Sequence, residues 1–299
     1  MTPPVSTTPA STTPNDIGII DLMIGFPFTD KTATYAERVK GVKDSASEDL
    51  SMPAGFLFKD APDAVDASEV DPIDITFTEM DKYGIDQGLF GLSERSIEAA
   101  ARYPGRVNFI TEVDPNDVMG AVREIQQAKA DHDLKAVSVF PAGCMPQVPV
   151  NDPKMYPLYA AAIELDIPVV INGGTAGPRL PSACQHVELF DIVCYDFPEL
   201  KLVMRHGGEP WEALAVKLML KWPNLYYMTS AFAPKHYPEA IIKYANTRGT
   251  DKIMYAGYWP AGLTIERIMG DMIDVPFRDH VWSKFLRENA MRVFNLDAS

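Results

Sequence analysis

Short runs of β-branched and other apolar residues recur along the chain from residue 17 onward, and most are followed by a segment with helical spacing. Continuous apolar runs of about four to eight residues are typical of strands that are buried on both faces, as in a parallel sheet. The runs occupy residues 17–24, 87–92, 107–113, 136–140, 168–172, 200–206, 225–230 and 252–258. The pattern therefore predicts eight parallel strands.

The segments between these runs carry helix start and stop signals. Asp152 and Pro153 have the residue types of an N-cap and a first helical position before 155–166. Pro210 precedes 211–222, where Trp211 and Leu218 belong to one apolar stripe. Gly249 follows the helix expected over 237–247. Helices and strands are thus predicted to alternate.

Eight strands alternating with helices over about 250 residues predict a (β/α)8 TIM barrel. An open doubly wound sheet is the alternative, but it calls for a glycine-rich phosphate turn after the first strand, and IIDLMIGFPF has none. The aperiodic segment 26–71 carries four phenylalanines and is expected to form a lid or insertion over the barrel mouth. We expect one domain over residues 16–299.

Composition narrows the class of protein. Residues 1–14 are almost entirely Thr, Pro and Ser, so a mobile tail is expected over 1–15, without the features of a secretory signal. A net charge of −14 argues against nucleic acid or an anionic membrane as partner. Three cysteines without a C-x-x-C pair favour a reducing compartment. We expect a cytoplasmic protein with a small-molecule substrate, and association between copies stays open.

Polar side chains stand at the predicted carboxyl ends of the strands, where a barrel carries its chemistry. They are Asp21, Asn172, His206, Ser230 and Tyr258. His206 comes before two glycines and has an ordinary pKa near neutrality, so it is the predicted catalytic acid or base. Asp21 is the second catalytic candidate. A structural hydrogen-bonding role is the alternative for both Asp21 and Asn172.

Residues after the strands complete the candidate site. Glu209 and Trp211 begin the helix after the sixth strand and are expected near the mouth. Arg179 and Lys235 lie in the loops after the fifth and seventh strands and are the predicted cations for an anionic substrate. Strand alternation predicts that Arg205 lies on the opposite face from His206, in a helix-facing ion pair or behind the site.

Several segments, in the right order, resemble the amidohydrolase-related family of metal-dependent hydrolases and decarboxylases. The likeness covers residues 17–296 and is carried by ARYPGRVNFITEVDPND, YPLYAAAIELDIPVVINGGTAGP, LVMRHGGEPW, WPNLYYMTSA, DKIMYAGYWP and the closing FLRENAMRVFNL. The resemblance implies a barrel enzyme with its site at the strand ends.

The metal ligands implied by this resemblance are mostly replaced. The family pattern D-x-H-x-H on the first strand reads Asp21-Leu22-Met23-Ile24-Gly25, so both histidines are missing. Asn172 replaces the fifth-strand histidine, Tyr258 replaces the last-strand aspartate, and His206 alone remains. A thioether, an amide and a phenol do not substitute for imidazoles and a carboxylate on Zn²⁺ or Mn²⁺. No cofactor is therefore expected.

A barrel without a metal has to activate water with a side chain. His206 is the expected base or acid, and Asp21 orients it or acts as a base. Asn172, Ser230, Tyr258 and the amides of Gly173 and Gly207 are candidate oxyanion donors. The resemblance points to hydrolysis of aromatic or carboxylated substrates, including C–C cleavage of a β-keto acid or β-ketoacyl thioester in aromatic catabolism.

Two other hypotheses stay open. In one, Asp21, His206 and Glu209 hold a weak divalent metal for hydrolysis or decarboxylation. In the other, the barrel is catalytically dead and acts as a binding protein, because loss of metal ligands is what such decay would produce.

Overall fold

The computed structural model describes residues 17–31, 33–35, 41–47, 52–58 and 61–297. The mobile tail predicted over 1–15 lies outside these residues. Within them, no helix is long and apolar enough to cross a membrane.

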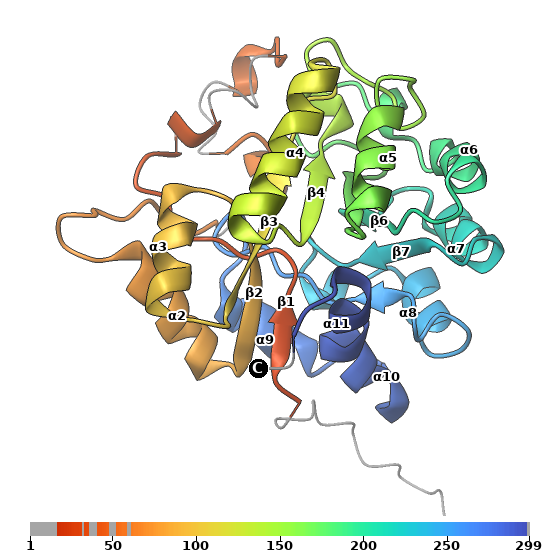
Figure 1. The fold of residues 1–299 in the computed structure, drawn as a ribbon. Coiled ribbons are helices and arrows are strands. Elements are labelled where there is room, and N and C mark those ends of the chain that lie inside the picture. Colours follow the sequence, from red (N-terminus) through yellow and green to blue (C-terminus); the bar gives the residue numbers. More distant parts are fainter. Residues whose placement is uncertain (1–16, 32, 36–40, 48–51, 59–60, 298–299) are drawn as a thin grey trace, which may run out of the picture.

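Eight parallel strands follow one another around a single sheet in chain order (Figure 1). They are β1 Ile19–Asp21, β2 Ile85–Gly91, β3 Val107–Glu112, β4 Ala136–Val139, β5 Val169–Asn172, β6 Leu202–Arg205, β7 Leu225–Met228 and β8 Ile253–Met254. The sheet closes where the Leu22 amide donates to the Tyr255 carbonyl at 3.4 Å and the Gly25 amide donates to the Trp259 carbonyl at 2.9 Å. The predicted (β/α)8 TIM barrel is confirmed.

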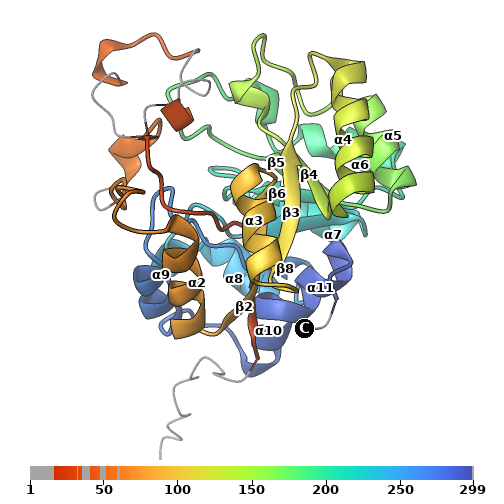
Figure 2. The ribbon, with the colours of Figure 1, turned by 60° about the vertical axis from the view of Figure 1, so that its left-hand side comes forward.

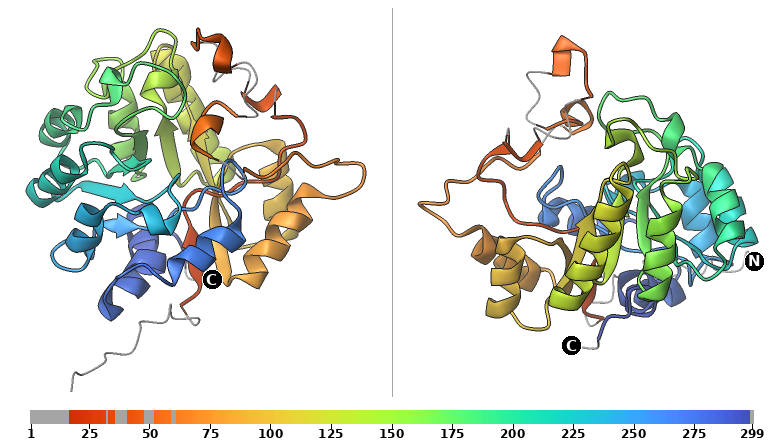
Figure 3. Two further views of the ribbon diagram at one scale, coloured as in Figure 1. Left: turned by 180° about the vertical axis from the view of Figure 1, so that it is seen from behind. Right: turned by 45° about the horizontal axis from the view of Figure 1, so that its top comes forward.

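Helices form the outer ring around the strands (Figures 1 and 3). They are α2 Pro72–Lys82, α3 Glu94–Arg102, α4 Val118–His132, α5 Tyr156–Glu164, α6 Leu189–Asp196, α7 Glu212–Lys221, α8 Glu239–Ala245, α9 Ile265–Met272, α10 Asp279–Ser283 and α11 Asn289–Phe294. Side-chain caps start several of them. Asp71 accepts the Ile73 amide before α2, and Ser93 forms a capping box with Ser96 before α3.

The start predicted for the fifth helix is wrong by a few residues. The carboxylate of Asp152 accepts the Lys154 amide at 2.9 Å and so caps a turn, while α5 begins at Tyr156. Pro157 lies in the first turn of this helix. A backbone N–H in the first turn has no acceptor within the helix, so a proline there breaks no helical hydrogen bond.

The inside of the barrel is a packed apolar core. One buried cluster takes a residue from most strands: Ile20, Leu22, Leu89, Ala136, Val170, Val203, Met228, Met254 and Ala256. Phe294 and Leu296 from the end of the chain belong to the same cluster and cover it from the α11 side. The interior is therefore filled, as is usual for this architecture, and only its carboxyl end is left for chemistry.

The segment after β1 stands apart from the ring of helices, as the red and orange ribbon of Figures 2 and 3 shows. Its described parts reach loops at the barrel mouth. The Phe58 ring stacks on Tyr258, with centroids 5.4 Å apart, and Phe56 lies under the guanidinium of Arg179. The predicted role of 26–71 as a lid stays a prediction, and these contacts are consistent with it.

Candidate functional site

His206 follows directly on the last residue of β6 and has a left-handed backbone, with φ of +65°. Its amide donates to Oγ of Ser230 at 3.2 Å, and its ring Nδ1 lies 3.1 Å from the same oxygen. Ala231, next to Ser230, also has a positive φ of +73°. Such backbones cost energy in residues other than glycine and are concentrated at functional sites. The ends of β6 and β7 are thus locked together around one hydroxyl.

The sequence-based assignment of faces on β6 is wrong. Leu202 and Met204, which period-two alternation would place on the same face as His206, pack in the outer layer between strands and helices. Val203 lies in the interior cluster instead. His206 reaches Ser230 and the edge of the Tyr258 ring because the positive φ turns it out of the strand alternation.

Arg205 lies inside the barrel, which corrects the predicted helix-facing position. Its Nε donates to Oδ1 of Asn172, and its Nη2 lies 2.9 Å from a carboxylate oxygen of Glu112. Glu112 ends β3, and β4 and β5 separate that strand from β6, so the side chain crosses the interior to reach it. Arg205 is 6% exposed, and its alternation partner Val203 belongs to the interior cluster.

Asp21 is fully buried at the seam between β1 and β8. Its carboxylate accepts the Gly257 amide at 2.7 Å, the Met23 amide at 2.9 Å and the Tyr255 hydroxyl at 3.3 Å. Burial raises the pKa of Asp21 to about 6, although these three hydrogen bonds oppose the rise. Closing the barrel accounts for these contacts, and the catalytic role of Asp21 stays a prediction.

Asp21 and Met23 do not share a face, contrary to the expectation from alternation. Met23 packs against the interior cluster, whereas Asp21 bonds to Tyr255, a member of the outer layer. The reason is that β1 has three residues and the chain bends after Asp21, so period-two alternation stops there.

One aromatic ring lies beside His206 and a second stacks on it. The Tyr258 ring meets the His206 ring edge-on at 5.6 Å and stacks on Phe58 from the segment after β1. The Trp211 ring lies 4.0 Å from the His186 ring. Glu209 is exposed as a residue, but its carboxyl group is partly shielded from water. This desolvation, together with the nearby negative charge of Glu212, raises the pKa of Glu209. The mouth therefore offers flat apolar surfaces.

The two cations predicted from the sequence face carboxylates. Arg179 lies 2.5 Å from Asp44, and Lys235 lies 3.9 Å from Asp271. The Lys235 side chain is 47% exposed and the Arg179 side chain is 38% exposed. Their predicted part in substrate binding stays a prediction.

The loops after β5 and β6 interlock at their backbones. Gly174 has φ of +93°, and a Cβ there would lie 2.6 Å from the backbone nitrogen and oxygen of Glu209. The Thr175 amide donates to the Glu209 carbonyl at 2.7 Å. Only glycine permits this approach, and it ties the loop that follows Asn172 to the loop that follows His206.

The residues at the mouth do not suit a divalent metal. The family positions carry the thioether of Met23, no side chain at Gly25, the amide of Asn172 and the phenol of Tyr258. Across the described residues, no three His, Cys, Asp or Glu side chains gather as a possible metal site. The guanidinium of Arg205 also brings positive charge beside Asn172.

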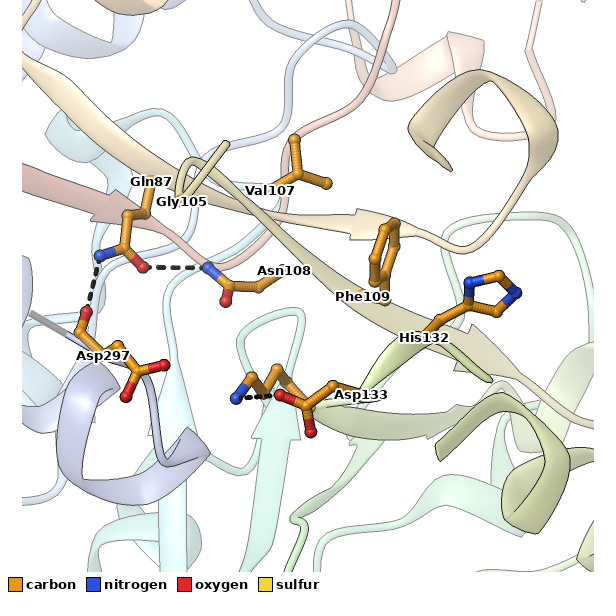
Figure 4. Close-up of a pocket in the computed structure, with 9 residues that line it drawn as sticks. Gln87, Gly105, Val107, Asn108, Phe109, His132, Asp133 and Asp297 are labelled. Carbon is orange, nitrogen blue, oxygen red and sulfur yellow. Dashed lines mark hydrogen bonds and ion pairs between the residues drawn. The ribbon is translucent and has the colours of Figure 1, made fainter. Parts of the chain in front are cut away.

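Two cavities lie at the other end of the barrel. One of about 250 Å³ is bordered by Gln87, Asn108, His132 and Asp297, near the starts of β2 and β3 (Figure 4). The Gln87 amide donates to the Asp297 carbonyl at 2.9 Å and accepts from Asn108 at 3.0 Å. A larger one of about 570 Å³ adjoins Ile19 and α9. Barrel enzymes keep their chemistry at the carboxyl ends, so we place the site at His206.

Sequence reasoning missed Arg205 and Glu112 as residues of the mouth. The sequence signal available was the position of Glu112 at the carboxyl end of the third strand, whereas the inward direction of Arg205 is visible only in the structure, where Val203 two residues earlier lies in the interior cluster. Their contact joins residues far apart in the chain, and no local pattern encodes it.

Solved structures of other proteins have the same fold as this chain. Solved structures that match along nearly their whole length include an uncharacterised TIM-barrel protein from Bordetella bronchiseptica, with 21% identity, TM-score 0.74 and coverage of 93% of this chain and 98% of that one. A 5-carboxyvanillate decarboxylase from Sphingomonas paucimobilis has 17% identity, TM-score 0.65 and coverage of 94% and 100%. A dihydroxybenzoic acid decarboxylase from Polaromonas, solved with manganese and 2-nitroresorcinol, has 16% identity, TM-score 0.67 and coverage of 94% and 98%.

These likenesses establish a shared fold. No curated protein sequence matches the chain. The family model described as Amidohydrolase matches residues 47–296, which include β2 to β8 and the residues from Glu112 to Tyr258 described above. The chain belongs to the amidohydrolase family.

Proposed function

We propose that this amidohydrolase-family protein is a hydrolase of small aromatic or carboxylated substrates that works without a resident metal. The observation that carries the proposal is the pairing of His206 with Ser230 at the barrel mouth. Histidine is the side chain whose unperturbed pKa lies near neutrality, so an imidazole held by both its backbone and its ring is suited to act as a general acid or base.

The proposed proton path begins at the His206 ring. The Ser230 oxygen accepts the His206 amide hydrogen and can still accept a second hydrogen from Nδ1. In that tautomer Nε2 carries the lone pair, so it can take a proton from an attacking water. Ser230 thereby positions the base and sets the nitrogen that reacts.

The reaction proposed is cleavage of a C–C bond next to a ketone. Water attacks the ketone carbon while His206 Nε2 takes its proton. The bond to the neighbouring carbon then breaks, and its electron pair leaves as an enolate, which His206 protonates. One carboxylic acid and one shortened acid or thioester result. This chemistry needs a base and carbonyl polarisation, for which Asn172, Tyr258 and the Gly207 amide are the proposed donors.

An aromatic substrate is supported by the rings around His206. Tyr258 offers a flat face beside His206, and Phe58 stacks on Tyr258. Two of the similar folds are named for enzymes that act on aromatic acids. Since decarboxylases are among these relatives, loss of CO₂ from an aromatic acid is the second candidate reaction.

The test is a turnover screen with β-ketoacyl thioesters, lactones and aromatic carboxylates, run with and without a chelator. His206→Asn is the matched variant because asparagine tolerates a positive φ better than most residues. We expect turnover that survives chelation and falls by about a hundredfold or more in the variant. Full activity of the variant contradicts the role of His206. Stoichiometric metal in purified, active protein contradicts the metal-free mechanism, and binding without turnover supports the dead barrel.

A further inference from the structure

We infer that Arg205, oriented by Asn172, is a binding site for a substrate carboxylate inside the barrel mouth. The inference deepens the proposed function, because it assigns the anionic part of the substrate to a residue adjacent to His206 in sequence. It rests on the position, burial and partners of this one guanidinium.

Burial is the first argument. Arg205 has a side chain that is 7% exposed, and a buried charge needs partners that hold it in place. Oδ1 of Asn172 accepts from Nε, which fixes the plane of the guanidinium. A guanidinium held in one plane presents a fork that matches the two oxygens of a carboxylate.

The ion pair between Arg205 and Glu112 is asymmetric in its exposure to water. The Glu112 side chain is 34% exposed, so its carboxylate lies at the water side of the pair while Arg205 lies at the buried side. A carboxylate from a substrate can take the place of Glu112 on Nη2, and the Glu112 side chain, which is already 34% exposed, then turns towards water. Glu112 acts in this scheme as an internal competitor that keeps the buried charge paired when no substrate is bound.

The third argument is electrostatic. The chain carries a net charge of −14, so an anionic substrate needs local positive charge to enter the mouth. Arg179 and Lys235 are exposed and face Asp44 and Asp271, where water screens them. The Arg205 charge is inside the barrel and is screened much less.

The binding test uses benzoate as the probe and benzamide as its uncharged counterpart, with affinities from calorimetry. We expect benzoate to bind with a dissociation constant of about 1 mM or tighter and benzamide to bind at least about tenfold more weakly. Arg205→Met is expected to lose about tenfold or more, and Arg205→Lys to keep part of the affinity, since it retains charge without the fork. Arg102→Met, a control in α3 whose guanidinium pairs with Asp71 and Asp74 away from the mouth, keeps wild-type affinity.

Glu112→Gln keeps Arg205 in place. Its result therefore does not depend on whether the protein folds without this buried arginine. Removing the competing charge is expected to strengthen benzoate binding severalfold. Benzoate affinity that is unchanged or weaker in Glu112→Gln, equal binding of benzoate and benzamide, or no benzoate binding at about 10 mM overturns the inference.

The binding test is separate from the test of catalysis. His206→Asn is expected to bind benzoate like the wild type. If benzoate binding follows Arg205 and Glu112 as described but no substrate is turned over, the proposed hydrolase function fails and the carboxylate site stands. If turnover depends on His206 but benzoate affinity does not change in the Arg205 variants, the hydrolase function stands and the carboxylate site fails.

Discussion

The Ser230 hydroxyl lies 3.1 Å from Nδ1 of His206 and accepts the backbone amide of the same residue at 3.2 Å. One oxygen therefore fixes both the ring and the strained backbone of the proposed base. The arrangement links the end of β7 to the end of β6 without a charged group.

Ser230→Ala is expected to lower kcat by about ten- to a hundredfold with little change in KM, because the ring loses its orientation. The pH profile should also change shape, since the hydroxyl no longer favours one tautomer. Steady-state kinetics across pH 5 to 9 measure both. Loss of the acceptor for a buried amide should also cost about 1–3 kcal/mol of stability.

Ser138→Ala is the matched control for that prediction. Ser138 is also buried at the carboxyl end of a strand, but its hydroxyl donates to the Thr111 carbonyl at 3.3 Å. Equal losses of kcat in the two variants would show that the effect of Ser230 is only structural.

The raised pKa of Asp21 predicts that the stability of the protein depends on pH. Its pKa is about 6 in the folded protein against a usual 3.8, so the neutral form is favoured by folding. Its contribution is fully present below pH 3.8 and is lost as pH rises through about 6. A rise of about two pKa units corresponds to about 3 kcal/mol.

Asp21→Asn removes this titration while its Oδ1 can still accept the Gly257 and Met23 amides. The unfolding free energy of the variant, relative to the wild type, is expected to rise by about 3 kcal/mol between pH 4 and pH 7. Urea denaturation at several pH values measures it. Parallel curves for the two proteins would contradict the assigned pKa, and loss of turnover in a stable variant would favour the catalytic role of Asp21.

Ala231→Gly is expected to stabilise the protein by about 0.5–1 kcal/mol, because φ of +73° is strained for alanine and ordinary for glycine. Ala233→Gly is the control. Ala233 has φ of −65°, so glycine there should destabilise by a similar amount. Thermal unfolding compares the two, and the same sign of shift in both would refute the strain argument.

Phe58→Ala is expected to raise KM for aromatic substrates by about tenfold, because the side chain stacks on Tyr258 beside His206. Aliphatic substrates of similar size should be affected less. Phe56→Ala is the control from the same segment, since Phe56 is 47% exposed and lies against Arg179. Equal effects of the two changes would argue against a specific aromatic contact at Tyr258.

The order of strands was predictable because each buried strand is a run of apolar residues, and such runs are visible in one sequence. Which residues of each strand point into the barrel was not predictable. Alternation holds only while the backbone stays extended, and it ends after three residues in β1 and again at Arg205 in β6. The positive φ of His206 is uncommon for any residue other than glycine, and the contacts of its amide and ring with Ser230 hold it in place.

The histidine of the site could be predicted, since it stands at a strand end before two glycines. Its partner Ser230 was recognised only as a possible oxyanion donor. Arg205 was assigned to the wrong side of the sheet, and its contact with Glu112 crosses two intervening strands. Distances of this kind depend on barrel closure and curvature, which no single segment determines.

The close approach of Gly174 to Glu209 has an evolutionary consequence. Because the backbones of the two loops touch, an insertion or a larger residue in one has to be accommodated by the other. The loops after β5 and β6 should therefore diversify together, in correlated steps.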